Sequence, residues 1–167
     1  ATFYERRHFA LVWCADPAAN AQAEVLAAAL EAAGDDGLRP DEYQPDAIRA
    51  ALTPYREGRA MSVAELAARD LLLTDAFLRF GTHLLVGRVD PQLVHSLWRA
   101  TLRDRDRVAE AAQALSERGV LAVLDDLRPP HAGYARLRVA LQHYRALATP
   151  EDWVPFPETL SLGLGDS

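Results

Sequence analysis

The sequence contains no lysine: all 18 basic residues are arginine, and 24 acidic residues outnumber them. The formal net charge of −6 argues against nucleic-acid binding, because contacts to backbone phosphates require a basic face. The densest basic stretch, Arg103–Arg107, alternates arginine with aspartate and nearly cancels its own charge. We therefore expect no nucleic-acid partner.

Cysteine is almost absent. Cys14 is the single cysteine, so no disulfide can form within the chain, and the cysteine count does not indicate a redox compartment. We expect this thiol, next to Trp13, to be a small buried apolar group. A reactive role would need a nearby base or cation, and only His8 is close in sequence.

Long hydrophobic runs are absent too, so no membrane-spanning helix is predicted. The chain starts at Ala1 rather than Met, which leaves open the removal of an upstream segment, although no signal-peptide pattern is visible. A length of 167 residues is enough for one domain with a substantial core.

Motifs for metal binding and catalysis are missing as well. The sequence has no His-x-x-x-His, Cys-x-x-Cys or His-Glu-x-x-His, no glycine-rich phosphate loop and no Gly-x-Ser-x-Gly. The acidic turn 35–43 lacks the alternating ligands of an EF-hand loop. We expect no catalytic residue, metal or cofactor site in the chain.

What the chain does have is alanine-rich helical patterning, and we expect an all-α fold. Ser62 and Glu65 form a capping box that begins a long central helix reaching Val86. We expect six to eight helices packed compactly around it, and an extended C-terminal tail. The other predicted helices cover residues 17–33, 45–52, 91–102, 104–118, 120–127 and 132–148.

Two charged residues lie inside the central helix. Asp75 and Arg79 are four residues apart and so share a face. We expect Asp75 to be a buried acid, hydrogen-bonded to a neighbouring segment or to Arg79. A general-acid role would also need a pocket and a second group. Arg88, beyond the helix end at Gly87, is expected to form a structural ion pair, with carboxylate binding as the alternative.

The last long helix begins after two prolines that break the preceding helix. We expect His131, at its start, to be neutral and hydrogen-bonded within the turn. Its apolar residues recur with helical spacing and predict an inward face. These residues are Tyr134, Leu137, Leu141 and Tyr144.

The tryptophans lie in three different settings. We expect Trp13, in the aromatic segment Phe3–Trp13, to cover the helical core. Trp98 lies in the predicted helix 91–102. Trp98 or Trp153 could instead bind a sugar, an alternative that rests only on their aromatic side chains. The helical pattern ends at Pro150, and Pro155 and Pro157 indicate an extended segment. We therefore expect a helical domain over 1–150 and an extended lead-out over 151–167, with a short strand over 159–164.

Five segments carry a family resemblance in a consistent order along the chain. They are LLLTDAFLRFGTHLLVGRVDP from Leu71, FYERRHFALVW from Phe3, GLRPDEY from Gly37, LRPPHAGYARLRVALQHYRAL from Leu127, and WVPFPETLSLGLGD from Trp153. Together they resemble the helical scaffold domain of YcbB-type L,D-transpeptidases, which are periplasmic enzymes that cross-link peptidoglycan.

The resemblance implies a periplasmic, non-catalytic scaffold that positions a catalytic domain in cis and offers surfaces to peptidoglycan or to cell-wall synthesis proteins. The family's catalytic domain carries His-Gly-Thr and Ser-His-Gly-Cys signatures, and this sequence contains neither. No transpeptidase nucleophile can therefore be assigned here. Two alternatives are a free-standing helical adaptor and a small enzyme whose site combines Asp75, Arg88 and His131.

Overall fold

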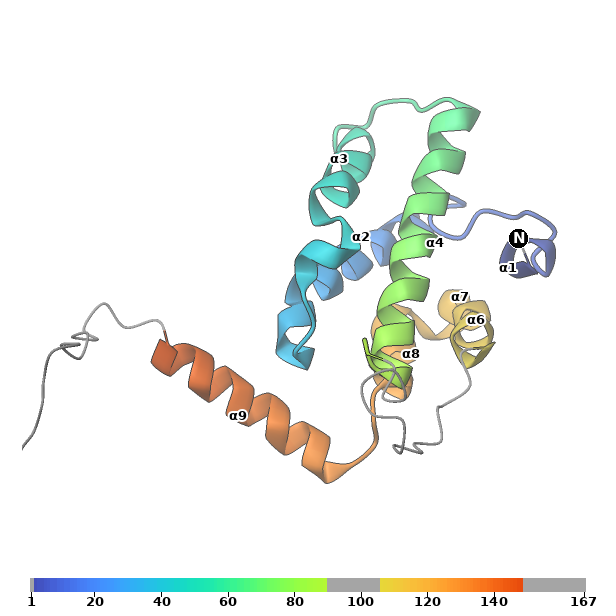
Figure 1. Cartoon of the computed structure of the whole chain (residues 1–167). Coiled ribbons are helices and arrows are strands. Elements are labelled where there is room, and N and C mark those ends of the chain that lie inside the picture. The colour runs from blue at the N-terminus through green and yellow to red at the C-terminus, as the bar shows by residue number, and fades with distance from the viewer. Residues whose placement is uncertain (1, 90–105, 149–167) are drawn as a thin grey trace, which may run out of the picture.

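The computed structural model describes residues 2–89 and 106–148, and there the fold is all-α, as the sequence predicts (Figure 1). No strand occurs in these two ranges. The longer helices are α2 (Pro17–Glu31), α3 (Pro45–Arg56), α4 (Val63–Val86) and α9 (Ala132–Ala148). The shorter ones are α1 (Thr2–Glu5), α6 (Asp106–Gln113), α7 (Leu115–Arg118) and α8 (Val120–Leu127), with 3₁₀ helices η1 (Ala32–Asp36) and η2 (Pro40–Tyr43).

Helix α4 is the central element, and its start follows the predicted capping box. The Ser62 hydroxyl accepts from the Glu65 N–H, and the Glu65 carboxylate accepts from the Ser62 N–H. These bonds satisfy two donors that a helix start leaves unpaired. The helix ends at Gly87, whose φ of 86° a side-chain-bearing residue rarely adopts.

The core surrounds α4, which contacts α2, α3, α6 and α8. Phe77 and Phe80 are completely buried on its inner face. Gly81 lets α6 and α8 approach closely: a Cβ at this position would lie 2.8 Å from Val108 Cγ1 and 2.9 Å from Leu127 Cδ1. The absence of a side chain at Gly81 therefore sets the spacing of these three helices.

Helix α3 is longer than predicted, because it continues through Pro54 to Arg56 rather than ending at Leu52. Pro54 lies in the last turn, where its missing N–H removes one helical hydrogen bond near the end. The Arg56 guanidinium also donates to both carboxylate oxygens of Glu24 on α2, at 2.9 and 2.6 Å. This ion pair holds the final turn of α3 against α2.

The predicted helix over 104–118 is divided in the structure into α6 and α7, which are separated at Ala114. The predicted helix over 91–102, the strand over 159–164 and the extended lead-out lie outside the described residues, as do Trp98 and Trp153.

Helix α9 departs most from prediction. It extends away from the other helices (Figure 1), and among the described elements its one substantial contact is with η1. None of its side chains is buried, and Leu137 and Tyr144 are each 69% exposed. Tyr134 and Leu141 are partly buried, so the expected inward face is wrong for Leu137 and Tyr144. Helical spacing shows that apolar residues share a side of a helix, but not that another described part of the chain covers that side.

Candidate functional site

The best-defined surface feature is α9, which we call the α9 arm, together with the acid that holds it. The Asp36 side chain, at the end of η1, is only 1% exposed. Arg128, which follows α8, donates to its carboxylate through Nε and Nη2 at 2.9–3.1 Å. Tyr134 Oη and Arg138 Nε, both on the arm, each lie 2.9 Å from Asp36 Oδ1. We call these four residues the Asp36 anchor.

Burial and charge at the anchor change proton affinities. Burial raises the pKa of Tyr134 to about 12, and the hydrogen bond to the Asp36 carboxylate adds to the rise. Burial alone would lower the pKa of Arg128, but its hydrogen bond to Asp36 and the charge of that carboxylate produce a net rise. Tyr134 therefore remains a neutral donor and Arg128 a cation at physiological pH.

Two further polar contacts join the arm to η1. Arg138 Nε also donates to the Asp35 carbonyl at 3.4 Å, and Arg145 Nη1 donates to the Gly34 carbonyl. The arm is thus held through arginines and a tyrosine rather than through buried apolar side chains. Because hydrogen bonds from charged groups have a preferred geometry, this arrangement fixes one face of the arm toward η1.

The apolar side chains of the arm remain largely exposed. Leu137 and Tyr144 lie seven residues apart, so they share a face. Val139 is 66% exposed on another side of the helix. The shared face of Leu137 and Tyr144 is therefore the candidate contact surface of the arm.

The buried acid of α4 is Asp70, not Asp75. Asp70 is 1% exposed, and its carboxylate accepts from the backbone N–H groups of Val12 and Trp13 and from the Tyr4 hydroxyl. The Trp13 indole N–H donates to Thr74 Oγ1 at 2.9 Å. Asp70 therefore fixes the N-terminal segment to the central helix, and Trp13, 1% exposed, lies in the core.

The helical pattern of α4 carries a signal for Asp70, although the prediction placed the buried acid at Asp75. Positions 70, 73, 74 and 77 share one face of α4, and Leu73 and Phe77 on that face are fully buried. Asp75 belongs to a different face, where its side chain is 56% exposed and pairs with Arg79 at 3.0 Å. The expectation of a buried Asp75 is wrong for this reason.

Of the other candidate residues, Arg79 and Arg88 meet at Glu42, whereas His131 lies elsewhere on the surface. Arg88 forms an ion pair with Glu42 at 2.7 Å, and Arg79 reaches the Glu42 carbonyl at 3.5 Å. His131 is exposed at the start of the arm. In the described ranges, the pockets of about 380, 340 and 270 Å³ are lined by none of Asp75, Arg88 and His131.

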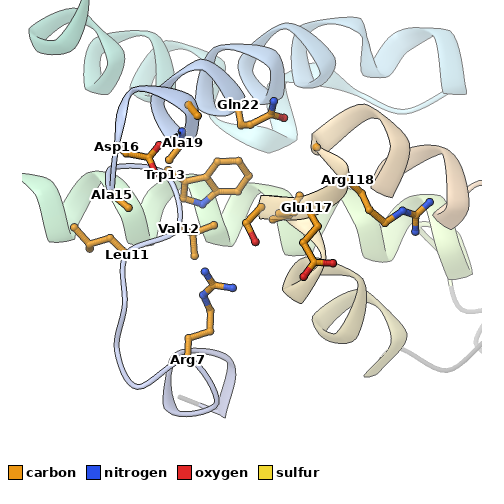
Figure 2. A pocket seen from close by; sticks show the side chains of 14 residues that line it. Arg7, Leu11, Val12, Trp13, Ala15, Asp16, Ala19, Gln22, Glu117 and Arg118 are labelled. Atoms are coloured by element: carbon orange, nitrogen blue, oxygen red, sulfur yellow. Dashed lines mark hydrogen bonds between the residues drawn. The ribbon is translucent and has the colours of Figure 1, made fainter.

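A pocket of about 380 Å³ lies between the N-terminal segment, the start of α2 and α7 (Figure 2). Figure 2 shows Arg7 entering from the N-terminal segment and Glu117 from α7. The Arg7 guanidinium lies 3.4 Å from Gln113 Oε1 and over the Phe3 ring. The lining residues include Ser116 but neither cysteine nor histidine, so this pocket holds no Cys–His or Ser–His pair.

A pocket of about 340 Å³ adjoins the Asp36 anchor and is lined by Asp36, Tyr134 and His83. His83 Nδ1 lies 2.8 Å from the hydroxyl of the buried Tyr43. Burial lowers the pKa of His83, so this imidazole is neutral at physiological pH. The histidine therefore joins η2 to α4 as a neutral hydrogen-bonding group.

Cys14 is half-buried, with its sulfur 3.8 Å from the Leu66 carbonyl. Burial raises the pKa of this thiol to about 11, although the nearby Arg69 charge opposes the rise. A thiol of this kind is largely protonated at neutral pH and is a poor nucleophile.

Within residues 2–89 and 106–148 the structure contains no cluster of three or more metal-binding side chains. No helix among them is both long and apolar enough to cross a membrane.

These features define a small all-α domain that displays a helix with exposed apolar side chains outside its core. The sequence model of the Scaffold domain family matches residues 1–141, which is most of the chain, and the chain belongs to that family. The match runs from α1 into the arm, confirms the scaffold-domain resemblance and supports a scaffold role. Neither the curated proteins nor the solved structures gave a significant match.

Proposed function

We propose that this domain is a non-catalytic scaffold of a periplasmic L,D-transpeptidase and positions the catalytic domain that cross-links peptidoglycan. The α9 arm is the contact surface in this proposal. The single observation that carries it is the exposure of Leu137 and Tyr144 on a helix that the Asp36 anchor holds in place.

Membership of the Scaffold domain family supports the proposal. The five ordered segments add to this support, because they resemble the scaffold domain of L,D-transpeptidases. The chemistry implied for the whole enzyme is acyl transfer through a cysteine thioester, with a histidine that activates the thiol. Cys14 is unsuited to that role, because it is half-buried with a raised pKa and the Ser-His-Gly-Cys signature is absent from the sequence. The nucleophile would come from a catalytic domain outside these 167 residues.

The first experiment is an immunoblot of the native protein in a cell extract and in a periplasmic fraction, with an antibody against this domain. We expect a periplasmic species far larger than 18.4 kDa, the mass of this chain. A native species of 18.4 kDa alone would contradict positioning in cis and would favour the free-standing adaptor.

The second experiment tests the arm in the purified native enzyme. We expect Leu137→Glu with Tyr144→Glu to reduce peptidoglycan cross-linking about tenfold or more, because two charges would enter an apolar contact. Leu121→Glu is the matched control: Leu121 is 58% exposed on α8, outside the arm. Equal activity of the arm variant and the control would contradict the proposed contact surface.

A further inference from the structure

Arg69 is a buried cation with unpaired donors. Only 4% of the residue is exposed, and its Nε and Nη2 atoms have no hydrogen-bond partner among the described residues. A guanidinium remains charged at every physiological pH, and burying it without an acceptor is unfavourable. An acceptor from outside the chain, reached by a rotation of the Arg69 side chain, would offset this cost.

The acids nearest to Arg69 along α4 are engaged elsewhere. Glu65 accepts from Ser62 and pairs with Arg59 at 3.0 Å. Asp70 accepts from the two backbone N–H groups of the N-terminal segment and from Tyr4. Neither carboxylate takes a hydrogen bond from Arg69 Nε or Nη2, so these donors lack the direct partner that a buried arginine normally has.

Arg69 lines a pocket of about 270 Å³ between α3 and the first half of α4, which we call the Arg69 pocket. Arg59 and Glu65 are its other charged residues, and the remaining wall residues are Ala51, Pro54, Met61, Ala68 and Leu72. Arg69 Cζ lies over the Tyr55 ring, 5.4 Å from its centroid, which is a cation–π contact. This volume is below the usual range for drug-sized ligands, so it suits a short one.

We propose that the Arg69 pocket binds a carboxylate carried on a short apolar chain. The planar guanidinium can donate two parallel N–H bonds to the two carboxylate oxygens, while the apolar chain contacts Met61 and Leu72. A phosphate fits less well, because it carries more charge and the pocket combines apolar walls with the Glu65 carboxylate. This proposal does not depend on the scaffold function.

The test is an NMR titration of the 167-residue chain with hexanoate, and with hexanamide as its neutral analogue. We expect saturable shifts of the Arg69 side-chain N–H and Leu72 methyl signals with hexanoate, and at least tenfold weaker binding of hexanamide. Equal binding of the two probes, or no binding of hexanoate at millimolar concentration, would overturn the proposal.

Three variants locate the site. Arg69→Met is expected to weaken hexanoate binding by about tenfold or more, since it removes both charge-assisted bonds. Arg79→Met makes the same change at an exposed position of α4 and is expected to bind like the wild type. Leu72→Glu is expected to abolish hexanoate binding, because it places a carboxylate one turn from Arg69. This variant tests the site even if Arg69→Met folds poorly. Wild-type affinity in Arg69→Met or Leu72→Glu would contradict the site.

A free small acid and the C-terminus of a peptide present the same chemistry. Titration with N-acetyl-alanyl-alanine and with its C-terminal amide distinguishes these sources. Tighter binding of this peptide acid than of hexanoate assigns the pocket to a chain terminus, and the reverse order assigns it to a small acid. Both results support the proposal, whereas a peptide amide that binds as tightly as the peptide acid contradicts it.

Discussion

Two buried carboxylates organise this chain at the scale of single residues. Asp70 fixes the N-terminal segment to α4, and Asp36 fixes the α9 arm to η1. Each accepts several hydrogen bonds from groups distant in sequence, which offsets the cost of burying its charge. The two acids therefore determine the positions of segments that apolar contacts alone would leave less well defined.

We predict that Asp70→Asn lowers the free energy of unfolding by about 2–4 kcal/mol, because it removes the charge from a buried, fully used set of hydrogen bonds. Asp75→Asn is the matched control on the same helix. The Asp75–Arg79 pair is exposed, so its change is expected to stay within about 0.5 kcal/mol. Urea unfolding of both variants checks this, and similar losses would contradict the assigned roles.

We predict that Cys14 reacts slowly with iodoacetamide at neutral pH. Burial raises its pKa to about 11, so the reactive thiolate forms only as the pH approaches that value. The raised pKa also affects folding, because the buried thiol stabilises the folded state only while it is protonated. This contribution is present below the ordinary pKa of cysteine and is lost as the pH rises toward about 11. Alkylation rates measured against pH check this, and a midpoint near 8.5, roughly the value of a free cysteine, would contradict it.

At the scale of elements, the sequence predicted the helix boundaries that residues within a few positions determine. The boundaries of α4 follow from the Ser62–Glu65 capping box and from Gly87, whose signals lie within a few residues. The burial of Asp70 and the exposure of α9 depend on segments dozens of residues away. Helical spacing identified the apolar residues of α9 correctly as a set, but it could not show that η1 alone, among the described elements, would contact the helix substantially.

The arm itself gives the next prediction. We expect Asp36→Asn, and more mildly Tyr134→Phe, to increase amide hydrogen exchange across α9, because a lone helix of 17 residues is marginal in water. Exchange in α4 is expected to remain near the wild-type rate, since α9 buries no side chain of its own. Uniformly faster exchange over both helices would show that the anchor supports the whole fold instead.

At the scale of the whole molecule, the spacing of helices around α4 depends on Gly81. We predict that Gly81→Ala lowers the free energy of unfolding by about 1–2 kcal/mol, because the new Cβ meets Val108 and Leu127 below 3.0 Å and this overpacking exceeds the helix preference for alanine. Gly133→Ala in α9 is the control, since its new Cβ meets nothing closer than 4.0 Å. Thermal melts of both variants show whether each substitution lowers or raises the stability. A stabilised Gly81→Ala variant would contradict the packing argument.

The anchoring of α9 also bears on how such a domain can diversify. Tyr134 and Arg138 hold the arm to Asp36, while the exposed positions contribute little to the stability of the helical body. Substitutions at those exposed positions can therefore accumulate with little effect on folding. Over evolutionary time, the same body could acquire arms that recognise different partners while its core sequence changes far more slowly.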